Sequence, residues 1–131
     1  MQNIVQDTTA DIVSDGEAAN DYFGVSVSSA GDLNSDGYSD VIVGAYSYGA
    51  DNNGRAYIFY GGSSPDNTAD VIMTGEATSN YFGVSVSSAG DLNSDGYSDV
   101  IVGANAYNSY TGRTYIYYGG CLLYTSDAAD E

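Results

Sequence analysis

The sequence predicts an all-β fold built from two copies of one antiparallel unit. Residues Tyr22–Ala45 and Tyr81–Ala104 both read YFGVSVSSAGDLNSDGYSDVIVGA, letter for letter. Short β-branched and apolar runs, which favour strands, alternate with clusters of Gly, Asn, Asp and Ser, which favour turns. No segment keeps a helical apolar period over more than one turn. These three observations indicate short strands repeated in tandem.

The repeat extends beyond this identical core on both sides. Upstream, ADIVSDGE at Ala10–Glu17 aligns with ADVIMTGE at Ala69–Glu76, at the same offset of 59 residues. Downstream, GRAYIFYGG at Gly54–Gly62 aligns with GRTYIYYGG at Gly112–Gly120. One residue is lost in the polar segment between Tyr46 and Gly54, which is typical of a surface loop.

Four strands are expected in each copy. In the first copy they lie near Val25–Ser28, Asp40–Val43, Arg55–Tyr60 and Asp70–Thr74. The third of these carries aromatic side chains on one face and apolar side chains on the other, so both of its faces need cover. Radial stacking of antiparallel sheets gives that cover, as between the blades of a β-propeller, and a closed propeller needs about 4–8 blades. The predicted fold is therefore a partial β-propeller of about two four-stranded antiparallel blades, completed by further blades or by other copies of the chain.

These observations divide the chain into four parts. We expect residues 1–17 to hold the last strand of a preceding blade, residues 18–76 to form the first blade and residues 77–120 to form an incomplete second blade. Residues 121–131 read CLLYTSDAADE and depart from the repeat. A transposon-end sequencing adapter can encode this peptide, so we expect a tail that is not native. The alternative is a divergent strand.

Composition excludes several kinds of function. The chain has 131 residues, with 18 acidic side chains against two basic ones and a formal net charge of −16. It holds no His and one Cys, which excludes His-dependent catalysis, an internal disulfide and a thiolate zinc site. Such an acidic surface repels nucleic acid and anionic membranes, and no stretch approaches the roughly 18 apolar residues of a membrane span. The acids favour a positive partner, of which a hard divalent cation is the simplest.

An acidic nine-residue motif occurs once in each copy and predicts the cation site. Asp32–Asp40 and Asp91–Asp99 share the pattern D-x-N-x-D-G-x-x-D, in which Gly allows a sharp turn and short oxygen side chains converge. Ca²⁺ takes six to eight oxygen ligands, at about 2.3–2.6 Å. The expected ligands are four side chains and one main-chain carbonyl, that of Tyr, in each loop: Asp32, Asn34, Asp36, Tyr38 and Asp40, and then Asp91, Asn93, Asp95, Tyr97 and Asp99.

Three alternatives to this Ca²⁺ site are weaker. An EF-hand needs Glu at the twelfth position and flanking helices, but Val43 and Val102 stand there and the flanks are strands. Mg²⁺ prefers a small, water-rich octahedral site. A glycosidase needs two carboxyl groups more than about 5 Å apart, whereas these acids share one tight loop. A solvated turn without a cation remains the simplest competing hypothesis.

The repeat resembles the FG-GAP repeat of the N-terminal β-propeller of integrin α-chains. Phe23-Gly24 and Phe82-Gly83 match the first element of that pattern, and Gly44-Ala45 and Gly103-Ala104 match the second, with the acidic loop between them. Tyr46 and Asn105 replace the Pro that follows in the family. The resemblance implies a seven-bladed ring with Ca²⁺ at the blade edge, away from the ligand face. Such a ring needs roughly 400 residues, so this chain supplies about a third of it.

Three functions fit these inferences. The first is a non-catalytic adhesion or ligand-binding module, extracellular or on the cell surface, that binds an unidentified protein or glycan. The second is an accessory propeller of a secreted enzyme, such as a phospholipase or a polysaccharide-degrading enzyme. The third is a two-blade protein that closes a ring from several copies. Met1–Ala10 does not resemble a secretory signal, so extracellular location rests on the resemblance and on Ca²⁺.

Two further features are expected to be structural. Phe23 and Phe82 are interpreted as core residues between blades. Arg55 and Arg113, the two cations of the chain, stand at equivalent strand starts and are interpreted as local ion pairs or as partners of tyrosine rings.

Overall fold

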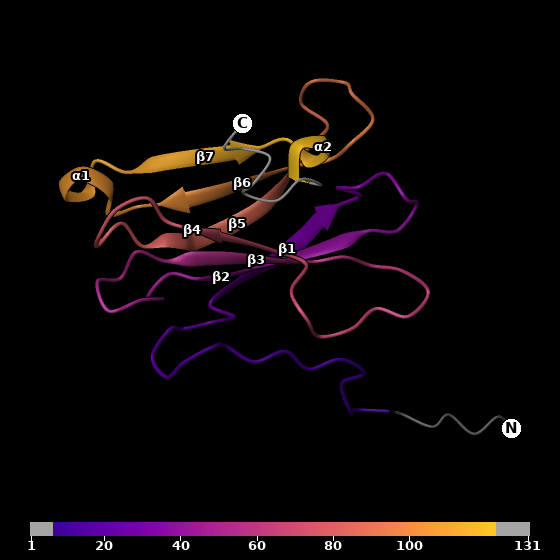
Figure 1. Cartoon of the computed structure of the whole chain (residues 1–131), viewed down its shortest axis with the longest axis horizontal. Coiled ribbons are helices and arrows are strands. Elements are labelled where there is room, and N and C mark those ends of the chain that lie inside the picture. The colour runs from indigo at the N-terminus through magenta and orange to yellow at the C-terminus, as the bar shows by residue number, and fades with distance from the viewer. Residues whose placement is uncertain (1–6, 123–131) are drawn as a thin grey trace, which may run out of the picture.

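A computed structural model gives the fold, and it describes residues 7–122. The described chain forms two antiparallel sheets that lie one over the other (Figure 1). The first sheet has the order β1-β2-β3-β4, made of β1 (Ser26–Gly31), β2 (Asp40–Ala45), β3 (Arg55–Phe59) and β4 (Val71–Thr74). The second has the order β5-β6-β7, made of β5 (Phe82–Gly90), β6 (Asp99–Ala104) and β7 (Arg113–Tyr117). The all-β prediction is confirmed, and two stacked meanders are what a partial propeller requires.

Two helical segments of four residues each complete the described structure. They are α1 (Tyr107–Tyr110) in the loop between β6 and β7, where Asn108 and Ser109 have left-handed dihedral angles that interrupt the helix, and α2 (Gly119–Leu122) after β7. Neither segment could be predicted from the sequence, because a single turn is too short to show an apolar period. Among the described residues, no helix has both the length and the apolar character needed to cross a membrane.

The identical sequences of the two sheets give the same strand register. Val27 pairs with Val43 in the first sheet, and Val86 pairs with Val102 in the second. Each pairing shifts by one residue near the end of its first strand, between Ser29 and Gly31 and at the equivalent place in the second sheet. The two sheets are therefore two copies of one blade, as the repeat predicts.

The main apolar core lies between the two sheets, and we call this interface the blade seam. Both blades contribute fully or nearly fully buried side chains to it, and β5 packs against β1 and β2. The first blade contributes Ala30, Leu33, Ile42, Ala56, Ile58 and Met73, and the second contributes Phe82, Val100, Val102 and Ala104. Phe82 is thus a core residue between blades, whereas its equivalent Phe23 is half-buried and packs edge-on against Tyr57 and Phe59.

The outer face of the first blade is more open than the same face of the second. Val41 is 46% exposed, but its repeat equivalent Val100 is fully buried at 0%. The first blade covers Val100 at the blade seam, and nothing comparable covers Val41 in the described chain. An apolar groove of about 550 Å³ lies here, with Val27, Val41 and Phe59 in its wall. Equivalent residues of the two sheets therefore differ in burial, because the described chain includes a blade that covers this face of the second sheet but none that covers this face of the first.

The predicted division of the chain stays a prediction. Residues 7–17 belong to neither sheet, and residues 1–6 lie outside the described part of the chain. The strand expected within 1–17 would pair with a preceding blade that the described residues do not include. Of the tail expected at 121–131, residues 123–131 also lie outside the described part.

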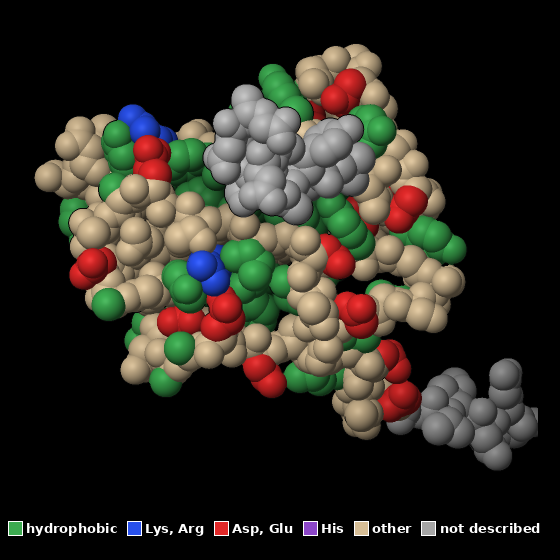
Figure 2. Space-filling view, in the orientation of Figure 1, with side chains coloured by type: hydrophobic (Ala, Val, Ile, Leu, Met, Phe, Trp, Pro, Cys, Tyr) green, Lys and Arg blue, Asp and Glu red, His purple; other side chains and the backbone are tan. Residues whose placement is uncertain are grey.

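Each blade carries one cluster of a glutamate, an arginine and two tyrosines, which we call the clasp. In the first clasp, Arg55 donates to Glu17 at 2.7 Å and lies 3.7 Å from the centre of the Tyr48 ring. The Tyr57 hydroxyl also donates to Glu17, and this bond, with the nearby Arg55, lowers the pKa of Glu17. Both cationic side chains of the chain are visible in Figure 2, each beside acidic ones.

The second clasp repeats this arrangement and crosses between blades. Glu76 follows the last strand of the first blade, and it accepts hydrogen bonds from Arg113 and Tyr115 of the second. Arg113 lies over the Tyr107 ring, also at 3.7 Å from its centre. The interpretation of both arginines as local ion pairs and tyrosine partners is confirmed. Because both ion pairs are at least partly exposed to solvent, we expect each to contribute only modestly to stability.

The repeat offers a matched test of the blade seam. We expect Val100→Ala to lower the free energy of unfolding by about 2 kcal/mol, because it removes buried methyl groups and leaves a cavity. Val41→Ala, the same change in the same local sequence, should cost less than about 0.5 kcal/mol. Urea unfolding of both variants measures the difference. Equal losses would contradict the assignment of the main core to the blade seam.

Candidate metal centre

The two acidic motifs form turns at the same place in each blade. The first acid loop, Asp32–Asp40, joins β1 to β2, and the second acid loop, Asp91–Asp99, joins β5 to β6. The last Asp of each motif is the first residue of the following strand. Rigid strands therefore hold both ends of each loop, which limits how far its oxygen atoms can move apart.

Carboxylates at the first and fifth positions fold each loop around its own backbone. The Asp32 carboxylate accepts from the amides of Asp36 and Gly37, at 3.1 and 2.8 Å. The Asp36 carboxylate accepts from the amide of Tyr38 at 2.9 Å. Gly37 has a φ of +91°, which a side chain would strain. The second acid loop repeats these bonds through Asp91, Asp95, Gly96 and Tyr97.

The ninth position is buried and links the loop to the rest of its blade. Asp40 is 1% exposed, and its two carboxylate oxygens accept from the amides of Leu33 and Gly61, at 2.7 and 2.8 Å. Asp99 is fully buried and accepts from the amides of Leu92 and Gly119 in the same way. This carboxylate therefore closes the loop and ties it to the end of the third strand of the blade.

Burial and backbone amides shift the acidity of the loop carboxyl groups in opposite directions. Burial raises the pKa of Asp40, and the amides of Gly61 and Leu33 offset only part of that effect. The negative charges of Asp36 and Asp32 raise the pKa of Asp40 further. In the second loop, the amide of Gly96 lowers the pKa of exposed Asp91. A cation would relieve the cost of the buried charge at the ninth position.

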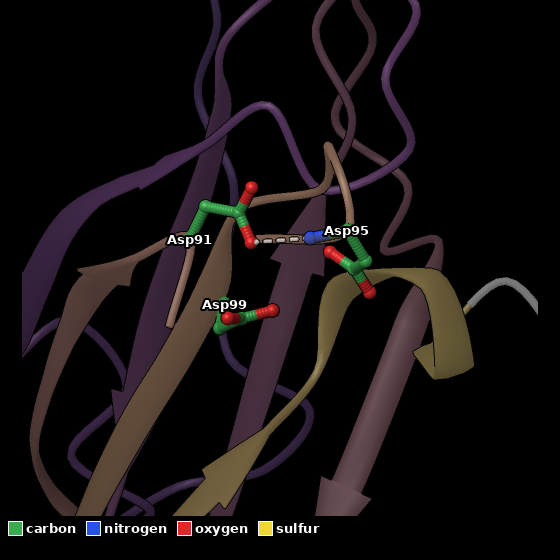
Figure 3. A group of neighbouring side chains, drawn as sticks. All are labelled: Asp91, Asp95 and Asp99. Carbon is green, nitrogen blue, oxygen red and sulfur yellow. Dashed lines mark hydrogen bonds between the residues drawn. The ribbon is translucent and has the colours of Figure 1, made fainter. Parts of the chain in front are cut away.

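Three carboxylates of the second acid loop converge on one small volume. One oxygen from each of Asp91, Asp95 and Asp99 lies within 4.8 Å of the others, and Figure 3 shows the three side chains around this space. It is the one such group of three among the described residues. In the first acid loop the equivalent acids share the same local hydrogen bonds but do not reach this spacing.

The loops fit a hard cation by donor chemistry and by one unpartnered atom. Their side chains offer carboxylate and amide oxygens, the ligands that Ca²⁺ prefers. Asn34 Oδ1 is buried and has no hydrogen-bond partner, which is costly for a polar atom unless something else binds it. The equivalent Asn93 is exposed. Tyr38 and Tyr97 donate their amides inside the loops, while the use of their carbonyls as ligands stays a prediction.

Sequence reasoning missed the backbone groups that position the ninth residue. It assigned Asp40 and Asp99 only as ligands, yet both also accept two amides each. The glycine pair that ends GRAYIFYGG and GRTYIYYGG was available as a signal, because Gly61 and Gly119 are its members. The sequence did not indicate that these glycines contact the carboxylates, because they lie about 20 residues further along the chain.

Stacked antiparallel blades, each with an acid loop between its first two strands, define a propeller repeat protein. Comparison with known families agrees: the profile of the FG-GAP repeat matches residues 23–59 and 82–117, more than half of the chain. The chain belongs to the FG-GAP repeat family. Both matched segments contain an acid loop and three strands of a blade.

The chain is also similar to curated integrin α-chains. It is 40% identical to integrin alpha-5 of Xenopus laevis over 96 residues, which cover 68% of this chain and 9% of that protein. It is 37% identical to integrin alpha-6 of Gallus gallus over 108 residues, which cover 80% and 10%. For integrin alpha-3 of Cricetulus griseus the identity is 38% over 119 residues, which cover 84% and 11%. The chain therefore spans about a tenth of the length of these relatives.

The two roles of the acidic residues can be separated without any cation. In the presence of a chelator, we expect Asp40→Asn to lower the free energy of unfolding by about 2 kcal/mol, because an amide NH₂ would face the amide of Leu33 or Gly61. Asp36→Asn keeps its accepting oxygen on an exposed side chain and should leave chelated stability unchanged. Denaturant unfolding measures both. A stable Asp40→Asn variant would show that the ninth residue does not close the loop.

Proposed function

We propose that the chain is part of a Ca²⁺-binding, integrin-α-like propeller that serves as a non-catalytic adhesion or ligand-binding module. The observation that carries the proposal is the convergence of three carboxylates in a loop that occurs twice with the same sequence. Membership of the FG-GAP family and similarity to integrin α-chains support it. The proposed ligands are Asp32, Asn34, Asp36, Tyr38 and Asp40 in one site and Asp91, Asn93, Asp95, Tyr97 and Asp99 in the other.

Electrostatics explains why a cation would stabilise this fold. Each acid loop holds three carboxylates within nine residues, and two bound Ca²⁺ ions would change the formal charge from −16 to −12. The loop backbone already neutralises part of this charge by directing amides at the carboxylates. A divalent ion would supply the rest and bind Asn34 Oδ1, a buried atom of the first acid loop that has no hydrogen-bond partner. Extracellular Ca²⁺, at millimolar levels, fills even weak sites of this kind.

Adhesion and ligand binding are proposed for the opposite ends of the blades. The acid loops precede β2 and β6, and the segments 46–54 and 105–112 follow these strands, so the two sets of loops lie at opposite ends of the sheets. The segments that follow carry exposed or half-exposed tyrosines, a residue type favoured at interfaces. A protein or glycan partner outside the cell, or at its surface, fits this arrangement and the similarity to integrin α-chains.

The exposed apolar face of the first blade is proposed to pack against a further blade. The outer face of the first blade exposes Val27 and Val41, whose repeat equivalents pack at the blade seam. A preceding blade of the same kind would bury them in the same way, as in a ring of several blades. The similarity to much longer integrin α-chains supports a longer array.

Ca²⁺ dependence is the test of this proposal. We expect millimolar Ca²⁺ to raise the melting temperature of the chain by at least about 5 °C relative to chelator, because an ion at 100 times its Kd adds about 2.7 kcal/mol. The double variant Asp36→Ala with Asp95→Ala should lose this rise. Calorimetric titration with CaCl₂ should show two ions bound by the native chain and none by the variant. Equal Mg²⁺ should give a smaller rise.

A matched double variant controls for loss of charge and of local turns. Asp7 and Asp66 are exposed, and each accepts the amide two residues later, as Asp36 and Asp95 do. Asp7→Ala with Asp66→Ala should keep the full Ca²⁺ response. The proposal fails if the folded native chain takes up no Ca²⁺, or if this control loses as much response as the acid-loop variant.

A further inference from the structure

We propose that the two acid loops are coupled through the blade seam, so that Ca²⁺ in one loop increases the affinity of the other. This inference rests on the proposed Ca²⁺-binding function and adds a regulation of those sites. It concerns how two sites of the same sequence act on each other. Three contacts in or beside the loops would carry this coupling, and equivalent residues of the two loops differ in burial.

A direct hydrogen bond joins the loops. The amide of Ser98, at the eighth position of the second acid loop, donates to the carbonyl of Asp32, at the first position of the first acid loop, at 3.0 Å. Asp32 is a proposed ligand, and Ser98 lies between the proposed ligands Tyr97 and Asp99. Movement of the second loop therefore acts on the backbone of a ligand in the first.

The side chain of Ser98 also packs against the residue before Asp32. A Cβ built on Gly31 would lie 2.5 Å from Ser98 Oγ and 2.7 Å from Ser98 Cβ, which is too close for any side chain. Gly31 has a φ of +69°. The equivalent Gly90 has a similar φ of +72°, but a Cβ there would meet nothing within 4 Å. The close approach is thus a property of the contact between blades and not of the repeat itself.

The first loop is built into the blade seam, whereas the second is not. Leu33, at the second position of the first loop, is 0% exposed and belongs to the core between blades, but the equivalent Leu92 is 54% exposed. Gly119 completes the connection, because it donates to Asp99 and its backbone lies against the carbonyls of both Ser98 and Leu33. Ordering of the second loop would therefore restrain the first through the same packed atoms.

The sign of the coupling separates this contact from simple charge effects. An ion in one loop makes the potential at the other less negative, so electrostatics alone would weaken the second binding event. Restraint of shared backbone has the opposite effect, because the second ion then has less chain to order. If Ca²⁺ in one loop raises the affinity of the other, the restraint by the contact between Ser98 and Asp32 outweighs the electrostatic effect. Linkage also requires the effect to be the same in both directions.

A thermodynamic cycle measures the coupling factor. Calorimetric titration with CaCl₂ gives the binding constant of the second loop in Asp36→Ala and that of the first loop in Asp95→Ala. All constants are written as association constants. The coupling factor is the product of the two stepwise constants of the native chain, divided by the product of the constants of the two variants. We expect a factor of about five or more. A factor of one or less with two ions bound overturns the coupling alone, whereas absence of binding overturns the proposed function.

A matched pair of glycine variants tests the route. Gly31→Ala should push the loops apart and reduce the coupling factor to one or below, whereas Gly90→Ala imposes similar backbone strain and should leave it unchanged. Removing the opposing side chain in Gly31→Ala with Ser98→Gly should restore coupling. An unchanged factor in Gly31→Ala, or equal losses in both alanine variants, overturns the contact as the route. If Gly31→Ala does not fold, the cycle in the native chain still decides whether coupling exists.

Discussion

The stacking of one apolar sheet face on another is the constraint on which the rest of this structure depends. A four-stranded sheet of this sequence has apolar side chains on both faces, and neither hairpins nor turns can bury them. The blade seam buries one face of each blade, with Ile42 and Ile58 on one side and Phe82 and Val100 on the other. Because the repeat supplies the same two faces each time, the same interface can be formed at every step along an array. The acid loops and the clasps are placed by this stacking.

The acid loops show how a fold can hold clustered negative charge. Most of their carboxylate oxygens accept backbone amides, and the most buried ones, on Asp40 and Asp99, accept one at each oxygen. These bonds fix the loop in one shape but do not remove the charge, so the cost of burial still raises the pKa of Asp40. A loop of this kind is both preorganised and incompletely neutralised, and that combination is what the proposed cation site requires.

The sequence was sufficient to predict what repeats and insufficient to predict what differs between repeats. The strands, their antiparallel order and the acidic residues follow from local pattern and from the tandem copies. Identical segments necessarily give identical predictions, so the different burial of Leu33 and Leu92 could not be foreseen. The same limit applies to Phe23 and Phe82 and to Ser98, whose contact with Asp32 depends on which blade comes next. The amides that hold Asp40 were missed because Gly61 is distant in sequence.

Position at the blade seam also determines what a bound cation would stabilise. A cation in an isolated hairpin would stabilise only the turn that holds it. Here the first acid loop places Leu33 in the core between blades, and its Asp32 carbonyl accepts from the neighbouring blade. A cation that fixed that loop would therefore fix part of the interface, and its binding free energy would add to the stacking of blades as well as to the turn. An acid loop beside the blade seam would therefore place the proposed cation next to the packing that joins the two blades.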